Sequence, residues 1–170
     1  MQKPNPDEYN PFFQKYIDHT GEEGFYPMFK QATLMAINFF ENIPHEKHNH
    51  AYALDKWTIK QVLMHIIDAE RVFSYRALVA ARGDNKTELQ LFDEDLYALN
   101  ADVAKRNMES LLEEFKVVRR SAEILFENIT EEQSRFKANA GPHPITVRAL
   151  GYIMMGHTIH HINVVKEKYL

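Results

Sequence analysis

Hydrophobic residues recur at three- and four-residue steps along most of this 170-residue chain. Such spacing is typical of amphipathic α-helices, because residues three and four apart share one helix face. The alternation with a period of two that would indicate strands is absent from the sequence. The pattern therefore predicts an all-α protein.

Four long helices are predicted, over residues 21–42, 58–83, 101–128 and 146–170. Capping boxes, Thr20 with Glu23 and Thr58 with Gln61, are expected to open the first two. Pro27 is tolerated only in a first turn, so the first helix can begin as late as Phe25. The buried face of that helix is expected to comprise Phe25, Phe29, Ala32, Met35, Ala36 and Phe39.

The connections between these helices are about 14–18 residues long, more than the usual 2–8 of a simple bundle. The sequence therefore predicts a four-helix bundle with long connecting loops, folded over one end of it. Residues 21–170 form this bundle domain. Residues 1–20, which include Pro4, Pro6 and Pro11, are expected to be an irregular N-terminal arm packed on the surface.

Composition narrows the class of protein. Hydrophobic residues make up 45% and charged residues 26% of the chain, as in ordinary soluble domains. The net charge of −4 argues against a nucleic-acid partner. The N-terminal residues show no apolar signal segment, and no apolar run approaches the ~18 residues of a membrane span. A cytoplasmic protein with no membrane partner is expected.

Cysteine is absent, so a metal site would use His, Asp, Glu or water. In the last helix, GHTIHHINVV places His157 and His161 in the apolar seam, whereas His160 is expected to face the edge or solvent. Histidines at i and i+4 can share one metal ion. The alternative is a pair of core histidines hydrogen-bonded to neighbours, since an unpartnered buried imidazole costs roughly 1–3 kcal/mol.

A third ligand must come from another helix, and His65 is the only histidine in the second or third predicted helix. Three neutral imidazoles leave positions open for water or substrate, which is typical of catalytic sites rather than structural ones. Thr158 stands where the HExxH motif of zinc peptidases has its glutamate, which argues against a peptidase. The other histidines are expected to lie outside the site. His45, His48 and His50 are assigned to a solvated loop, and His19 and His143 to arm or loop segments.

The sequence resembles the DinB-like (YfiT-like) metal-binding four-helix family over residues 25–170. The resemblance rests on KWTIKQVLMHIIDAERVFSYRALVAARGD, on LQLFDEDLYA and on ITVRALGYIMMGHTIHHINVVKEKYL. It implies that His65, His157 and His161 hold a divalent ion, nickel or zinc. The family contains thiol-dependent S-transferases, maleylpyruvate isomerase-like enzymes and proteins described only as metal-dependent hydrolases. The resemblance also implies a homodimer.

The leading hypothesis is a metal-dependent enzyme that activates water or a low-molecular-weight thiol against a small electrophilic substrate. Asp68 and Glu70, close to His65 in sequence, are candidates for accepting a proton or orienting a ligand imidazole. Salt bridges between helices explain both carboxylates at least as well. Trp57 and Tyr75 are candidates for the pocket wall. The alternative function is a non-catalytic bundle that binds metal or a small molecule in a stress response.

Overall fold

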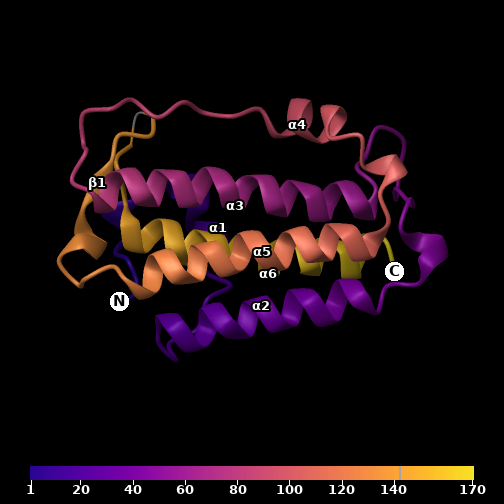
Figure 1. Cartoon of the computed structure of the whole chain (residues 1–170), viewed down its shortest axis with the longest axis horizontal. Coiled ribbons are helices and arrows are strands. Elements are labelled where there is room, and N and C mark those ends of the chain that lie inside the picture. Colours follow the sequence, from indigo (N-terminus) through magenta and orange to yellow (C-terminus); the bar gives the residue numbers. More distant parts are fainter. Residues whose placement is uncertain (142) are drawn as a thin grey trace.

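The computed structural model describes residues 1–141 and 143–170; Pro142, which falls in the predicted loop before the last helix, lies outside them. Four long helices run along the length of the molecule: α2 (Phe25–Glu41), α3 (Ile59–Ala81), α5 (Met108–Glu127) and α6 (Val147–Lys168) (Figure 1). The predicted all-α four-helix bundle with long connections is confirmed.

Short elements occupy the connections. The chain between α3 and α5 crosses above α3 and contains α4 (Glu94–Asn100) (Figure 1). A further short helix, α1 (Gln14–Ile17), precedes α2. β1 (Lys137–Ala138) pairs antiparallel with β2 (Ile145–Thr146) just before α6. Strands of two residues are too short to leave an alternating pattern, so they are not predicted from the sequence. Single 3-10 turns lie at Pro6–Glu8, Pro11–Phe13, His45–Lys47, Val103–Lys105 and Gln133–Arg135.

Helix starts follow the capping side chains. Thr58 and Gln61 form the predicted capping box of α3. The predicted box at Thr20 is wrong, because its hydroxyl donates to the Ile17 carbonyl at 2.7 Å, and α2 begins only at Phe25. This later start leaves Pro27 in the first turn, where its missing N–H costs nothing.

The third predicted helix begins seven residues later than expected. The Asn107 side chain accepts from the Ser110 N–H at 2.8 Å and caps α5, so Met108 is its first residue. Residues 103–105 form a separate 3-10 turn because Asp102 has a left-handed backbone (φ 44°), which interrupts the helix.

The core surrounds α6. Its first half is buried on every side, because α1, α2 and α3 pack around it and α5 lies close by. On α2 the predicted buried face is wrong at two positions: Met35 is 37% exposed and Phe39 is only partly buried, whereas Phe40 is fully buried. Helix α3 buries the apolar stripe expected from its three- and four-residue spacing, which comprises Ile59, Val62, Ile66, Ala69, Phe73 and Ala77. It and α6 make the most extensive helix–helix contact of the bundle.

The first 20 residues are part of the core rather than an arm on the surface. Tyr9, Tyr16 and Ile17 are buried, and α1 lies against α6. An ion pair fixes this segment: Glu8 Oε2 accepts from Arg148 Nε at 2.7 Å, and Arg148 Nη2 donates to the other carboxylate oxygen. The prolines shape turns in this segment, but its aromatic side chains bind it to the bundle.

Loss of this ion pair is expected to destabilise the fold. Burial alone would raise the pKa of Glu8, but hydrogen bonds from Arg148, the Asn5 N–H and Thr146 lower it from 4.5 to about 2. Its stabilising contribution is therefore present above pH 4.5 and is lost as the pH falls toward 2. Glu8→Gln leaves Arg148 buried and unpaired and should cost about 3 kcal/mol in urea unfolding at pH 7.

The matched control for Glu8→Gln is Glu22→Gln. Glu22 is exposed and pairs with Lys3 at 3.3 Å, so its replacement should change stability by less than about 1 kcal/mol. Equal effects of the two variants would contradict the role given to Glu8.

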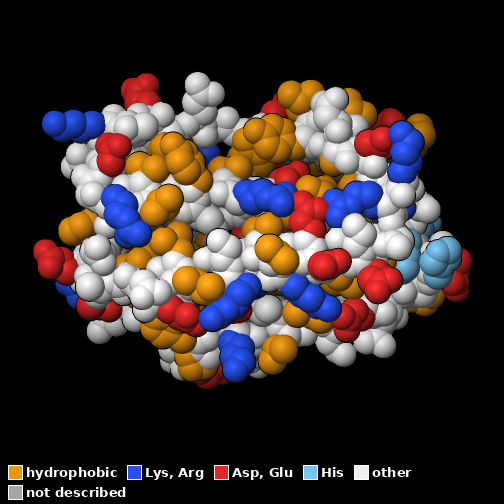
Figure 2. All heavy atoms as spheres, viewed as in Figure 1, with side chains coloured by type: hydrophobic (Ala, Val, Ile, Leu, Met, Phe, Trp, Pro, Cys, Tyr) orange, Lys and Arg blue, Asp and Glu red, His pale blue; other side chains and the backbone are white. Residues whose placement is uncertain are grey.

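Basic and acidic side chains alternate over the face formed by α2, α3 and α5 instead of separating into patches of one sign (Figure 2). Among the residues that the structure describes, no helix combines the length and apolar character needed to cross a membrane.

Candidate metal centre

Three histidines from two helices converge at one point. His65 comes from α3, and His157 and His161 come from adjacent turns of α6. His157 Nε2 lies 3.0 Å from His65 Nε2 and 3.1 Å from His161 Nε2. The structure thus brings together the three residues that the sequence singled out.

This arrangement fits a metal ion better than a hydrogen-bonded cluster. A neutral imidazole Nε2 offers either one proton or one lone pair, so His157 Nε2 cannot make two full hydrogen bonds to its neighbours. Nitrogen ligands about 2.1 Å from a tetrahedral ion lie roughly 3.4 Å apart, close to the spacing observed. The donor set of three neutral imidazole nitrogens suits zinc, copper, iron or nickel.

Burial keeps the three rings neutral, which is the form that binds metal. It lowers the pKa of His65 from 6.5 to about 4. Burial, with the neighbouring imidazoles, lowers the pKa of His157 and of His161 well below 6.5.

A pocket of about 690 Å³ opens onto these rings. Its size lies within the usual range for small-molecule sites. Residues from the N-terminal segment, α3, the connection to α4, the residues before α6 and α6 itself line it: Asn10, Phe12, Phe13, Lys15, Tyr16, Trp57, His65, Phe73, Arg76, Leu91, Phe92, Glu94, Ala140, His143, Ile145, His157, His160 and His161.

Aromatic rings surround the histidines. Ring centroids of Trp57 and His65 are 4.7 Å apart, and those of Tyr16 and His157 are 5.1 Å apart in an edge-to-face arrangement. Phe73 packs against His157 from the other side, at 5.9 Å. Burial, reinforced by the charge of Glu94, raises the pKa of Tyr16 to about 12, so its hydroxyl stays protonated. These rings limit the access of water to the histidines.

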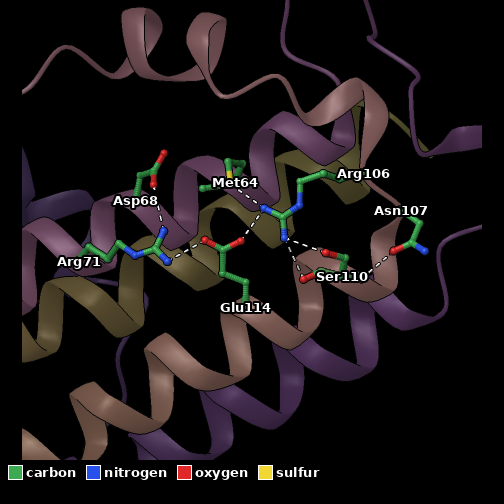
Figure 3. Close-up of polar contacts among 7 residues, drawn as sticks. All are labelled: Met64, Asp68, Arg71, Arg106, Asn107, Ser110 and Glu114. Atoms are coloured by element: carbon green, nitrogen blue, oxygen red, sulfur yellow. Dashed lines mark hydrogen bonds and ion pairs between the residues drawn. The ribbon is translucent and has the colours of Figure 1, made fainter.

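Neither Asp68 nor Glu70 lines the pocket. At 100° per residue, Asp68 is rotated about 60° and Glu70 about 140° from His65 around α3. Asp68 instead accepts from Arg71 at 3.4 Å, within a network that joins Arg71 and Arg106 through Glu114 on α5 (Figure 3). The geometry therefore favours salt bridges, within α3 for Asp68 and between α3 and α5 for Glu70, over the predicted role of these carboxylates as bases.

Glu70 touches the site only through other side chains. Arg119 Nη2 donates to Glu70 Oε2 at 2.7 Å and to Thr158 Oγ1 at 2.8 Å, and Thr158 follows His157 on α6. The buried guanidinium also lies 4.9 Å from the ring centre of Phe29. This chain of contacts supports the turn that carries His157.

Several lining residues were missed or misplaced by the sequence reasoning. Phe13 and Tyr16 belong to the segment expected to be an arm, although their spacing of three is a helical signal. His143 and His160 also reach the pocket, against expectation. Tyr75, a predicted wall residue, is 56% exposed and does not line it.

Other sequence predictions agree with the pocket. Trp57 lines it, as expected. The loop histidines stay outside it: His45 and His48 pack ring to ring at 5.2 Å, and His50 contacts Tyr169. Glu94, for which no role is predicted above, also lines the pocket.

The low pKa of His65 predicts acid sensitivity of the metal-free protein. The unfolded chain takes up a proton near pH 6.5, whereas folded His65 does so only near pH 4. Stability should therefore fall as the pH drops from 6.5 toward 4, by up to about 1.4 kcal/mol per pH unit for this one group. Urea unfolding of EDTA-treated protein at pH 7, 6 and 5 measures the slope. His65→Gln should make stability depend less steeply on pH. Identical slopes for the variant and the wild type would contradict the low pKa of His65.

The fold and the site together define a class: a four-helix bundle with a candidate three-histidine metal centre. The sequence profile of the DinB superfamily matches residues 28–165. The chain belongs to that family. No curated protein sequence matches the chain.

Solved structures show the same fold. YfiT from Bacillus subtilis, described as a probable metal-dependent hydrolase with an unusual four-helix bundle topology, matches with a TM-score of 0.74 and 17% identity. The match covers 97% of this chain and 90% of YfiT. The mycothiol-dependent maleylpyruvate isomerase matches with a TM-score of 0.66 and 9% identity, over 86% of this chain and 61% of that protein. At these identities the likeness establishes the fold alone.

Proposed function

We propose that this chain is a metal-dependent enzyme in which His65, His157 and His161 hold one divalent ion, zinc or nickel. The observation that carries the proposal is the convergence of three Nε2 atoms on a pocket large enough for a small substrate. Three protein ligands leave coordination positions open toward that pocket. The structural neighbours described as a probable metal-dependent hydrolase and as a mycothiol-dependent maleylpyruvate isomerase support a catalytic role.

The reaction proposed is attack by water or by a low-molecular-weight thiol on a small electrophile. The bound ion supplies Lewis acidity, which makes water or a thiol nucleophilic at neutral pH. The chain contains no cysteine, so an attacking sulfur would come from the small-molecule thiol. The aromatic side chains Trp57, Tyr16 and Phe73 hold the substrate body and exclude bulk water.

The protein's own residues keep the centre in its binding form. Burial holds the three imidazoles neutral, and the Arg119–Thr158 hydrogen bond fixes the turn of α6 that carries His157. Glu94, at the pocket wall, is the carboxylate that we propose exchanges a proton with the substrate. A homodimer and a cytoplasmic location remain predictions.

Metal content and turnover together test the proposal. Protein purified without a histidine tag should contain about one zinc or nickel ion per chain by elemental analysis. It should then be screened with activated esters and amides, and with glutathione plus an electrophilic acceptor such as chlorodinitrobenzene. Turnover that EDTA abolishes and metal restores supports an enzyme. A full complement of metal without turnover in either screen favours the non-catalytic bundle that binds metal. Absence of metal contradicts the enzyme and leaves only a bundle that binds a small molecule without metal.

A further inference from the structure

Arg76 is a buried cation in the wall of the pocket. It lies eleven residues after His65 on α3, within about 20° of three full turns, so both residues occupy the same helix face. Its side chain is 5% exposed and lines the pocket that opens onto the histidines. Along α3, roughly 16 Å separates the two Cα atoms.

The guanidinium of Arg76 has no carboxylate partner among residues 1–141 and 143–170. Its recorded hydrogen bond runs from Nη2 to the Gln90 carbonyl, at 2.7 Å, which uses one of five donors. The two other buried arginines are both paired, Arg119 with Glu70 and Arg148 with Glu8. Burial lowers the pKa of Arg76, yet an arginine stays charged at neutral pH. A buried, unpaired charge is costly unless an anion joins it.

The other charged groups of the pocket lie at exposed positions. The Lys15 ammonium sits over the rings of Phe12 and Tyr16, at 4.2 and 4.9 Å from their centroids. Glu94 is exposed and lies in the wall contributed by α4. Between Arg76 and the histidines the wall is largely aromatic, with Phe73 on the same helix.

We propose that Arg76 binds the anionic group of the pocket's ligand, and that this ligand is an elongated amphiphilic anion. Its carboxylate or similar group pairs with Arg76, its apolar body lies along the aromatic wall, and its other end reaches the three histidines. Only the assignment of the reacting end rests on the proposed function. The anion can belong to the electrophilic substrate or to the thiol, since both kinds of molecule can carry a carboxylate.

Binding of model compounds tests the proposal without knowledge of the substrate. The probes are 4-phenylbutanoate, its neutral analogue 4-phenylbutanamide, and glutathione as a thiol that carries carboxylates. Ligand-observed NMR gives the Kd, and fluorescence of Trp57, the single tryptophan, gives a second readout from the pocket wall. Each titration is run on the zinc-loaded and on the EDTA-treated protein, because a carboxylate can also bind the metal.

Wild-type protein should bind at least one of the two anions, with or without zinc, and Arg76→Gln should weaken that binding at least about tenfold. Binding of the amide and zinc content should stay unchanged. If Arg76→Gln loses affinity for 4-phenylbutanoate, the anionic group is assigned to the substrate. If it loses affinity for glutathione alone, the anionic group is assigned to the thiol. Arg76→Lys, which keeps the charge, should restore part of the affinity.

Arg82→Gln is the matched control, because it removes the same charge from the exposed end of α3. Unchanged affinity for both anions in Arg76→Gln, or equal losses for anion and amide, would overturn the proposal. If Arg76→Gln does not fold, comparable affinity of the wild type for 4-phenylbutanoate and its amide, with no binding of glutathione, overturns it as well. The metal assignment is tested separately: His65→Ala should lose zinc and keep the Arg76-dependent anion binding.

Discussion

His157→Ala is expected to abolish stoichiometric metal binding. His157 Nε2 is the central atom of the three, 3.0 Å from His65 Nε2 and 3.1 Å from His161 Nε2. Loss of a direct ligand should weaken metal binding by more than the roughly 10–100-fold that loss of an outer partner costs. Elemental analysis of the dialysed, untagged variant should fall from about one ion per chain to a small fraction. The thermal stabilisation that zinc gives the wild type should disappear with it.

His160→Ala is the control for this variant. His160 lies on the same helix and lines the same pocket, but it is not one of the three convergent histidines. It should therefore keep its metal. Full metal content in His157→Ala, with wild-type circular dichroism, would refute the three-histidine centre. Equal losses in both variants would indicate that disruption of the pocket is responsible.

Gly156→Ala is expected to separate the N-terminal segment from the bundle. A Cβ at position 156 would lie 1.9 Å from the Tyr16 carbonyl oxygen and 2.5 Å from its carbon. These are backbone atoms, so no side-chain rotation relieves the clash and α1 must move. Alanine is the better helix former by about 1 kcal/mol, but overpacking of this kind costs about 1–3 kcal/mol. We therefore expect the substitution to lower the free energy of unfolding. The variant should unfold at lower urea concentration.

Hydrogen exchange locates the effect. In Gly156→Ala the amides that α1 protects, such as those of Asp18 and His19, should exchange faster, together with easier proteolysis of the N-terminal segment. Gly151→Ala is the comparison, because its Cβ meets the rings of Phe25 and Phe126 and not α1. It should destabilise the core without selective exposure of α1. Unchanged protection of α1 in Gly156→Ala would disprove the close approach of the two helices.

The helices and the three histidines were predictable because both depend on local spacing. The seam of α6 places His157 and His161 on one face, and the face of α3 that borders its buried stripe presents His65 to them. The capping side chain of Thr58 fixed one boundary correctly. The capping box predicted at Thr20 was wrong because the Thr20 hydroxyl donates to the Ile17 carbonyl instead, a contact that exists only in the folded turn.

The rest of the pocket depends on contacts between distant segments. Phe13 and Tyr16 reach the site because Gly156 admits the backbone of α1 and Arg148 holds Glu8. Nothing in the local pattern of residues 1–20 encodes these partners. Of the two roles left open for Glu70, the structure shows the salt bridge, since its partner Arg119 lies on another helix and directs it away from the pocket.

The pairing of Glu8 with Arg148 also sets an order of assembly. These residues are 140 positions apart, and two of the three histidines lie beyond Arg148. A chain made from its N-terminus therefore carries Tyr16 and Ile17 uncovered until α6 has emerged. Helix α6 then brings together the earlier segments that line the pocket and supplies two of the three metal ligands. The metal centre of a nascent chain therefore cannot form before α6, the helix against which the shielding N-terminal segment packs.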